Sequence, residues 1–289
     1  MSEHYVDKTS CLEALPPEWP SDLMPEICDR VRKSRAKVVV LDDDPTGTQT
    51  VHGIPVLTGW DVPGLTRELK NPEKAFFILT NSRSLTTPDA CRLGQELGKN
   101  LKAASEAAGI PVSIISRSDS TLRGHFPQEV DEVSTVMGDY GLPYIVCPFF
   151  QEGGRFTIND IHYVDEKNKL VPAARTAYAK DATFGFSNSN LCKWIEEKTK
   201  GRISAGDVTC ITLSDIRQQG PDRVTEKLMT VPEGSACIVN AVSYRDMEVF
   251  MLGLLKARSA GKRFLYRTAA SFVRVRAGVA PKKTFLSTD

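Results

Sequence analysis

The chain alternates short apolar runs with polar turns and helical segments over much of its length. Apolar runs of four to six residues occupy 38–41, 75–80, 111–115 and 144–147. Strands that are apolar throughout are typical of parallel sheets, because helices cover both faces of such a sheet. The pattern therefore predicts an α/β fold with three layers, in which a mostly parallel sheet carries helices on both faces.

Capping and periodicity signals place the remaining elements. Thr87 is predicted to cap a long helix that begins near Pro88 and ends at Gly109. Further helices are predicted over 24–33, 63–69, 126–137, 190–199 and 244–259, and further strands over 54–58, 208–213, 237–240 and 263–266. The stretch from 156 to 190 is less regular, with a short strand predicted at 161–164 and a small helix at 172–181.

The same pattern divides the chain into three segments. Residues 1–36 are predicted to be an N-terminal extension, since three prolines between 15 and 20 exclude regular helix or central strand there. Residues 37–277 form the predicted α/β domain. Residues 278–289, with one proline and two lysines, are predicted to be a linker.

Composition narrows the classes of function. The 289 residues carry a net charge of +1, so nothing indicates a nucleic-acid or acidic-membrane partner. No apolar run approaches the roughly 20 residues of a membrane span, and the N-terminus lacks a signal-peptide pattern. The seven cysteines are scattered without a CxxC pair, which favours a cytoplasmic protein and argues against a zinc site.

The first predicted strand runs directly into an acidic stretch. Residues 38–41 are followed by three aspartates, 42–44, and then by a Pro-Thr-Gly turn that contains Thr46 and Gly47. Charge is costly to desolvate, so these carboxylates are expected where the strand leaves the sheet. In open parallel sheets that edge is where ligands bind. A solvated turn that caps a helix is the plainer interpretation, but three acids after an apolar strand favour a site.

Four loops that follow predicted strands carry most of the distinctive polar chemistry. Their sequences are DDDPTGT, NSRS, SRSDSTLRGH and EGGR, and they supply Asp43, Asp44, Asp119, Arg83, Arg117, Arg123, Arg155, Ser84, Ser120 and Thr121. In the last loop, Gly153 and Gly154 either let the backbone approach a ligand closely or merely turn the chain. Arginine binds carboxylate or phosphate through a planar fork, and a carboxylate can orient or deprotonate an alcohol. The mixture suits a small polyhydroxylated acid. Salt bridges that merely fix the loops would explain any single pair, but explain four loops at one edge less well.

Other candidate groups carry weaker signals. His125 and His162 are more typical of hydrogen bonders at helix or strand edges than of acid–base catalysts, and His52 is no stronger a candidate. Neither a GxxxxGK nor a GxGxxG sequence occurs, so the chain has no nucleotide-binding fingerprint of either kind.

At these loops the sequence resembles the four-carbon acid sugar kinases, a family once grouped as uncharacterised "type III effectors". Residues 43–47 match its Asp-Asp-x-Thr-Gly opening, and residues 80–83 match its Thr-x-Ser-Arg element. Residues 117–124 match Lys-x-Asp-Ser-Thr-Leu-Arg-Gly, the most specific of the motifs, and residues 148–155 are similar to its Pro-x-x-x-x-Gly-Arg element. The resemblance covers roughly 36–270, which corresponds to the family's N-terminal domain.

The resemblance implies the substrate-binding part of an ATP-dependent kinase for a four-carbon sugar acid, such as threonate, erythronate or a keto relative. It implies Asp43 or Asp44 as base or hydroxyl orienter, Arg83 and Arg123 for the substrate carboxylate, and Asp119 and Ser120 for its hydroxyl groups. The other matched positions expected at the substrate are Thr46, Gly47, Arg117, Gly154 and Arg155. ATP and Mg²⁺ are expected mainly on a second, C-terminal domain, and this chain supplies no metal ligand in that scheme. A homodimer is compatible with the sequence.

The sequence departs from the family pattern in three ways. Arg117 replaces the usual lysine, which keeps the charge, and Gln49-Thr50 replaces the usual Asn-Asp, which removes a carboxylate and puts the identity of the acid in doubt. The glycine-rich domain with the ATP site would begin near residue 285, so the chain alone is expected to be inactive as a kinase.

Two alternatives belong to other classes. The run VVVLDDDPT also fits the opening of haloacid dehalogenase-type phosphatases, with Asp42 as nucleophile and Asp44 as acid/base. Such enzymes need a late acidic pair for Mg²⁺, for which Asp207 is a poor candidate because it precedes a strand. A non-catalytic ligand-binding module is the other alternative, and ATP turnover would distinguish it from a kinase.

Overall fold

The large sheet of the computed structural model, which describes residues 5–46 and 50–279, contains eight parallel strands in the order β10-β11-β6-β12-β5-β2-β4-β3. The strands are β2 (Lys37–Asp42), β3 (Val56–Leu57), β4 (Ala75–Leu79), β5 (Val112–Arg117), β6 (Tyr144–Cys147), β10 (Thr209–Ile211), β11 (Ala236–Val239) and β12 (Leu265–Thr268).

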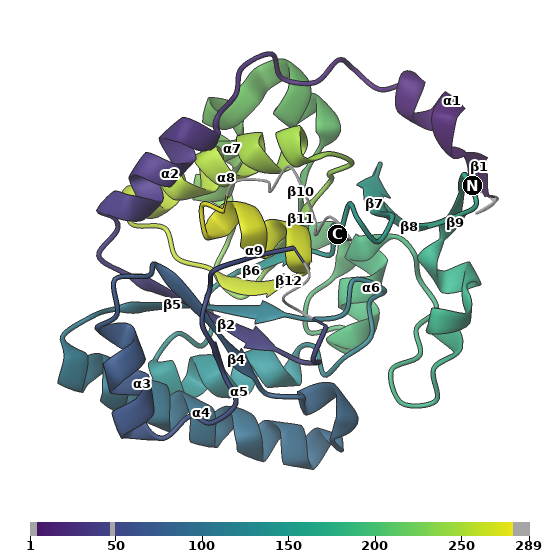
Figure 1. Ribbon diagram of the computed structural model, residues 1–289. Coiled ribbons are helices and arrows are strands. Elements are labelled where there is room, and N and C mark those ends of the chain that lie inside the picture. Colours follow the sequence, from purple (N-terminus) through teal and green to yellow (C-terminus); the bar gives the residue numbers. More distant parts are fainter. Residues whose placement is uncertain (1–4, 47–49, 280–289) are drawn as a thin grey trace, which may run out of the picture.

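Helices cover both faces of this sheet (Figure 1). One face packs on α3 (Val62–Leu69), α4 (Thr87–Ala108), α5 (Gln128–Met137) and α6 (Leu191–Lys198), and the other on α2 (Met24–Lys33), α7 (Gly220–Thr230), α8 (Tyr244–Ser259) and α9 (Ala270–Arg276). Within β2, Val38 and Val40 join the second layer while Val39 and Leu41 join the first, as the period of two in a strand requires. The predicted three-layer α/β fold is confirmed.

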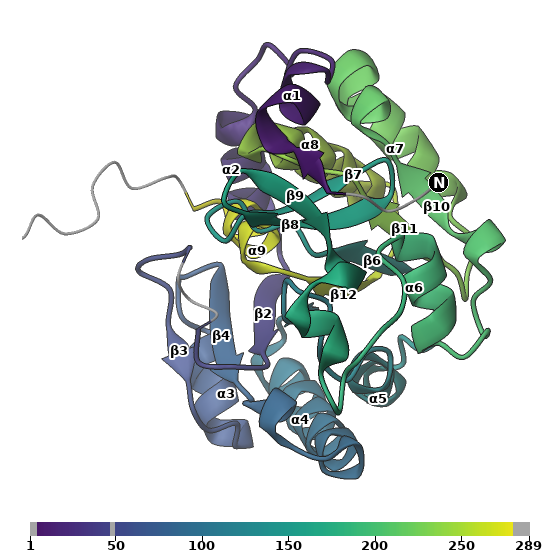
Figure 2. The ribbon, with the colours of Figure 1, turned by 90° about the vertical axis from the view of Figure 1, so that its right-hand side faces the viewer.

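A second, antiparallel sheet lies beside the first, close to the N-terminus (Figures 1 and 2). Its order is β1-β9-β8-β7, from β1 (Val6–Asp7), β7 (Arg155–Ile158), β8 (Ile161–Glu166) and β9 (Lys169–Pro172). The sequence analysis predicted only one of these strands. Both of its tight turns, Asn159-Asp160 and Lys167-Asn168, use left-handed residues without the glycine that marks most such hairpins.

Several predicted boundaries were wrong in instructive ways. Thr86, not Thr87, caps α4, because its side chain accepts the backbone N–H of Asp89. The small helix predicted over 172–181 is two 3₁₀ turns, Ala173–Arg175 and Ala177–Lys180. The strand predicted at 263–266 lies two residues later, so Arg267 is part of a buried strand.

Parts of the chain outside the predicted domain pack onto it. The N-terminal segment contributes β1 to the small sheet, a short helix α1 (Lys8–Glu13), and α2, whose Ile27 and Val31 are buried in the same cluster as α8. The sequence analysis also missed α7 and α9. No helix in the described ranges is long and apolar enough to cross a membrane.

Candidate functional site

The four polar loops meet at the carboxyl edge of the large sheet. They follow β2, β4, β5 and β6, which are parallel and therefore end on the same side. In the sheet order, β12 lies between β5 and β6, although its predicted strand stood last in the sequence. The end of β12 thus becomes part of the floor of the site.

An inner cluster, defined here as Asp42, Asp43, Asp44, Arg83 and Arg117, forms the first half of the site. Arg117 Nη1 lies 3.1 Å from Asp42 and 3.4 Å from Asp44. Arg83 Nη2 lies 3.0 Å from Asp43 Oδ1 and also contacts Asp44. Arg117 Nη1 is also 4.0 Å from Asp43, so each guanidinium bridges at least two of the carboxylates and the two arginines hold the three acids together.

The inner carboxylates differ in solvent access. The side chains of Asp42 and Asp43 are 3% and 1% exposed, whereas that of Asp44 is 22% exposed. Burial raises the pKa of Asp42 to about 7 despite the opposing charge of Arg117. Burial also raises the pKa of Asp43, whose Oδ2 has no hydrogen-bond partner among the described residues. Of the three acids, only Asp44 is open enough to touch a substrate.

Hydrogen bonds hold the loop after β4 against the inner cluster and against α5. Thr80 donates its N–H, at 2.9 Å, and its hydroxyl, at 2.8 Å, to the carbonyl of Asp42. The hydroxyl of Ser82 donates to Glu129 Oε2 at 3.1 Å, which ties the loop to α5. In this loop, therefore, Thr80 and Ser82 position the backbone, and Arg83 reaches the carboxylates.

An outer cluster, defined here as Asp119, Arg123, Arg155, Tyr178 and Asp181, forms the second half. Arg123 Nε donates to Asp119 Oδ2 at 2.7 Å, and its Nη1 lies 3.8 Å from Asp181. Burial alone would raise the pKa of Asp119, but hydrogen bonds from Arg123 and Thr121 lower it to about 2. Arg83 Nη1 lies 3.5 Å from Asp119 and so connects the two clusters.

Tyr178 brings the fourth loop into contact with the third. The guanidinium carbons of Arg123 and Arg155 lie 5.0 and 5.6 Å from the centre of its ring. Arg155 also donates to the Tyr178 hydroxyl at 3.3 Å and to the carbonyl of Gly153. Gly154 has a φ of +68°, and a Cβ at this position would lie 2.8 Å from Asp165, so the turn requires a glycine here.

The backbone around Arg123 has an uncommon conformation. Leu122 has a φ of 72° although it is fully buried in the core. A left-handed leucine is strained, and such strain clusters at functional sites. Gly124, on the other side of Arg123, has a φ of 114°, which favours glycine. Its Cα faces Asp43, since a Cβ built there would be in van der Waals contact with Asp43 Oδ2 at 3.4 Å.

The remaining predicted residues lie at the margins. Thr46 is exposed and donates its N–H to Asp44 Oδ1 at 2.7 Å, and Ser120 is half-buried, with its carbonyl 2.8 Å from the Nε2 of His162. Gly47 lies outside the described residues. Ser84 lies outside both clusters, where its hydroxyl donates to the carbonyl of Asn81.

The histidines have structural contacts. His125 lies 3.1 Å from the carbonyl of Leu85 and 3.3 Å from the hydroxyl of Thr87, and so joins the second and third loops. Burial lowers the pKa of His162 to about 3, which keeps this ring neutral. His52 is exposed.

Two charged residues of the site were missed by the sequence analysis. Arg267 is fully buried at the end of β12, and its Nη2 donates to the carbonyls of Asp119 and Arg123 at 2.8 and 3.1 Å. Glu129 is buried beneath the inner cluster, where desolvation, followed by the charge of Asp43, raises its pKa to about 7. A charged residue inside an apolar strand, as in FLYRT, was the available signal for Arg267.

The arrangement is suited to binding a small anionic, hydroxylated molecule. Its partly exposed groups are guanidinium, carboxylate and phenol, with Arg123 at 26% and Asp181 at 28% side-chain exposure. One oxygen from each of residues 42–44 lies within 4.8 Å of the other two, as metal ligands would, but Arg83 and Arg117 already form ion pairs with these carboxylates. Asp42 and Glu129, whose pKa values are raised to about 7, are buried, so Asp44 is the carboxylate of the inner cluster that a substrate could reach.

Relatives of known activity cover part of this chain. A D-threonate kinase from Bordetella bronchiseptica is 27% identical over 160 residues, which are 53% of this chain and 37% of the relative. A D-erythronate kinase from Heliobacterium modesticaldum is 25% identical over 226 residues, 75% of this chain and 48% of the relative. The chain therefore spans no more than about half the length of these relatives.

Solved structures share the fold at lower identity. A Bordetella bronchiseptica protein, described as a domain of unknown function (DUF1537) with bound citrate in a domain-swapped dimer, superposes with a TM-score of 0.60 at 19% identity, over 84% of this chain and 56% of that one. A Haemophilus influenzae protein of the DUF1537 family gives 0.59 at 17% identity, over 83% and 55%.

The family model named sugar-binding N-terminal domain matches residues 38–276. This range contains both clusters, Arg267 and Glu129. The chain belongs to the family of sugar-binding N-terminal domains.

Proposed function

We propose that the chain binds a four-carbon sugar acid, of the threonate or erythronate kind or a keto relative, as the substrate-binding part of an ATP-dependent kinase. One observation carries the proposal: the partly exposed guanidinium of Arg123 stands beside the carboxylates of Asp119 and Asp181 at the edge of a parallel sheet where ligands bind. The names of the two curated relatives point to the same substrates.

The exposures suggest how the roles are shared. Arg123 binds the substrate carboxylate, since its Nη atoms are the least committed of the site's guanidinium groups. Asp119 and Ser120 receive the hydroxyl groups. Asp44 accepts the proton of the attacking hydroxyl, while the sealed Asp43 holds Arg83 in place. Phosphoryl transfer depends mainly on such positioning and charge.

Kinase chemistry also requires ATP and Mg²⁺. The carboxylates of residues 42–44 are of the donor type that Mg²⁺ prefers, but they already form ion pairs with Arg83 and Arg117. We therefore place ATP and its metal mainly on a further domain, of the kind that would account for the greater length of the relatives.

Calorimetry on the chain as it stands tests this function. D-threonate, D-erythronate and their keto relatives are expected to bind weakly, because no second domain closes over them. The matched control is a tetritol with the same hydroxyls and no carboxylate, which is expected not to bind. If no acid binds at millimolar concentration while circular dichroism shows a folded chain, the proposal is wrong.

Two neighbouring proposals can be tested with the same material. The solved neighbours with citrate are domain-swapped dimers, so light scattering is a direct test of a homodimer here.

The burial of Asp42 and its pairing with Arg117 argue against a phosphatase nucleophile. Mg²⁺-dependent hydrolysis of a generic phosphoester by the chain would reverse that conclusion, and ATP turnover by the chain alone would show that no further domain is needed.

A further inference from the structure

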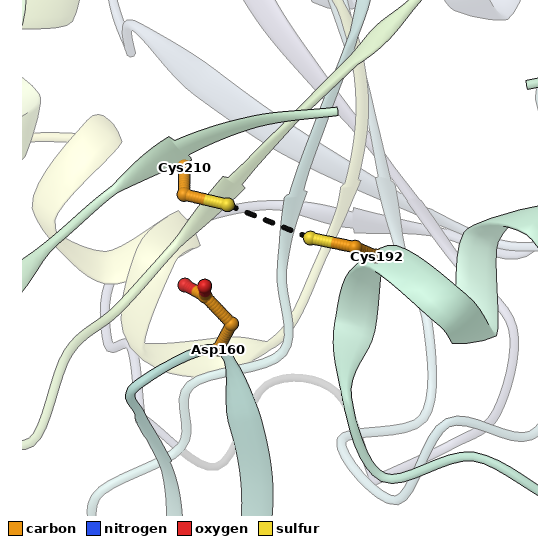
Figure 3. A group of neighbouring side chains, drawn as sticks. All are labelled: Asp160, Cys192 and Cys210. Carbon is orange, nitrogen blue, oxygen red and sulfur yellow. Dashed lines mark hydrogen bonds between the residues drawn. The ribbon is translucent and has the colours of Figure 1, made fainter. Parts of the chain in front are cut away.

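Three potential metal ligands from outside the four loops lie close together. Figure 3 shows Asp160 in the turn between β7 and β8, Cys192 at the start of α6 and Cys210 on β10, with the two sulfur atoms facing each other. One ligand atom from each residue lies within 4.8 Å of the other two. The two cysteines are 18 residues apart in sequence, so no local motif announced them.

The carboxylate of this group is held in a fixed orientation. Asp160 has a φ of 67°, and its N–H donates to the side-chain oxygen of Asn240 at 2.8 Å. The amide of Asn240 in turn donates to Asp160 Oδ1 at 2.8 Å and to the carbonyl of Ile211 at 2.9 Å. Asn240 is only 1% exposed. A buried amide that orients a carboxylate is what the outer shell of metal sites supplies.

The distance between the sulfur atoms fits two ligands of one ion. Cys192 Sγ and Cys210 Sγ are 3.5 Å apart. A disulfide would need about 2.05 Å. Two thiolates on a tetrahedral ion with bonds of about 2.3 Å would lie about 3.8 Å apart. The observed separation is therefore closer to the edge of such a tetrahedron.

Among the described residues, no positively charged side chain pairs with the carboxylate of Asp160 in this group. Deprotonation would make all three residues anionic, and among the described residues no Lys or Arg forms an ion pair with Asp160. The nearby ammonium of Lys227 is already engaged, at 2.8 Å from the carbonyl of Cys210 and 2.7 Å from Asp215. A bound divalent cation would compensate the thiolates and the carboxylate together.

We propose that Asp160, Cys192 and Cys210 form a site for a thiophilic divalent cation of the zinc class, with water as fourth ligand. Two sulfur donors select such ions against Mg²⁺ and Ca²⁺, which prefer oxygen. Binding releases the two thiol protons to solvent. The ion joins the β7–β8 turn of the small sheet, helix α6 and the edge strand β10 of the large sheet. This proposal revises the expectation of no zinc site, which rested on spacing alone.

Cobalt titration of the reduced, chelator-treated chain tests the site. One Co²⁺ per chain is expected, with thiolate-to-cobalt charge-transfer absorption and the strong visible bands of tetrahedral geometry, all lost when Zn²⁺ is added. Zn²⁺ is also expected to raise the melting temperature and to protect Cys192 and Cys210 from alkylation, measured by mass spectrometry. The alkylation readout needs no variant.

Variants then assign the ligands. Cys192→Ser and Cys210→Ser are expected to remove the tetrahedral spectrum, and Asp160→Asn to weaken Zn²⁺ binding while keeping the charge-transfer band. Asn240→Ala is expected to lower affinity roughly 10–100-fold, as outer-shell changes do. Cys91→Ser, which alters a half-buried thiol on α4, is the matched control and is expected to change nothing.

Three outcomes would overturn the proposal. The first is a Co²⁺ spectrum without charge-transfer bands, and the second is unchanged Zn²⁺ affinity in both cysteine variants. The third is rapid formation of a Cys192–Cys210 disulfide in air by a wild-type chain that takes up no Zn²⁺, which would make the pair a redox couple.

Discussion

At the carboxyl edge of the large sheet, the inner and outer clusters both set aspartates against arginines at similar distances. Arg117 lies 3.1 Å from Asp42 in the inner cluster, and Arg123 lies 2.7 Å from Asp119 in the outer one. Yet the pKa of Asp42 is raised to about 7, whereas that of Asp119 is lowered to about 2. An aspartate paired with an arginine thus has a raised pKa in the inner cluster and a lowered pKa in the outer cluster.

The difference comes from the number of hydrogen bonds that each desolvated carboxylate receives. Burial disfavours the charged form in both clusters, but Asp119 accepts from both Arg123 and Thr121. Asp42 shares one guanidinium with Asp43 and Asp44, and the charge of Asp43 adds to the penalty. The inner cluster therefore contains a carboxyl group, that of Asp42, whose pKa lies near neutrality. In the outer cluster, Asp119 stays charged at neutral pH and can help to orient a ligand.

Removing the guanidinium of Arg117, which three aspartates share, should have the largest effect on stability. Arg117→Met leaves buried Asp42 and Asp43 with less compensation, so we expect a loss of about 3–5 kcal/mol in the free energy of unfolding at pH 7. Urea denaturation measures this loss. The matched control, Arg123→Met, changes a guanidinium of the outer cluster with 26% side-chain exposure and is expected to cost much less. Equal losses of unfolding free energy in the two variants would show that the guanidinium groups of the two clusters contribute equally to stability.

A change at Arg123 should instead appear in binding. If its planar fork holds the substrate carboxylate, Arg123→Lys keeps the charge but loses the paired donors, and we expect sugar-acid affinity to fall about 30-fold, or about 2 kcal/mol. Calorimetry measures affinity and a thermal melt measures stability. Retained affinity with a lowered melting temperature would assign Arg123 to the scaffold, and the carboxylate site would then be sought at Arg83 or Arg155.

Counted per group and per pH unit, the smallest expected effect is the pH dependence of stability. Asp42 and Glu129 have raised pKa values of about 7, so between about pH 4 and 7 the unfolded chain releases protons that the folded chain keeps. Stability should therefore fall as pH rises through this range, by at most about 1.4 kcal/mol per pH unit for each group. Asp42→Asn and Glu129→Gln should each flatten the slope in urea titrations.

Asp119 provides the opposite sign in the same experiment. Because its pKa is lowered to about 2, its contribution to stability is present above about pH 4 and is lost as the pH falls toward 2. Asp119→Asn should thus alter only the acid end of the profile. The comparison would be contradicted if the slope of unfolding free energy against pH between pH 4 and 7 were unchanged in Asp42→Asn and Glu129→Gln but changed in Asp119→Asn.

The sequence alone was sufficient to predict the layers of the fold and the meeting of four polar loops at one edge of the sheet. Short apolar runs such as 38–41 and 75–80, between polar turns and helical segments, favour strands buried on both faces, and parallel strands end at one edge. Hence the loops after β2, β4, β5 and β6 were bound to converge. The motif residues within them, from Asp43 to Arg155, could be named before any contact was known.

Only the tertiary structure decided which charges meet. The insertion of β12 between β5 and β6 brought Arg267 under Asp119, a residue 148 positions earlier in the chain. The hairpins of the small sheet and the meeting of Asp160 with Cys192 and Cys210 arose in the same way. Strand order, burial and ion pairing depend on packing between distant segments, and their energies are set by desolvation that no local sequence pattern records.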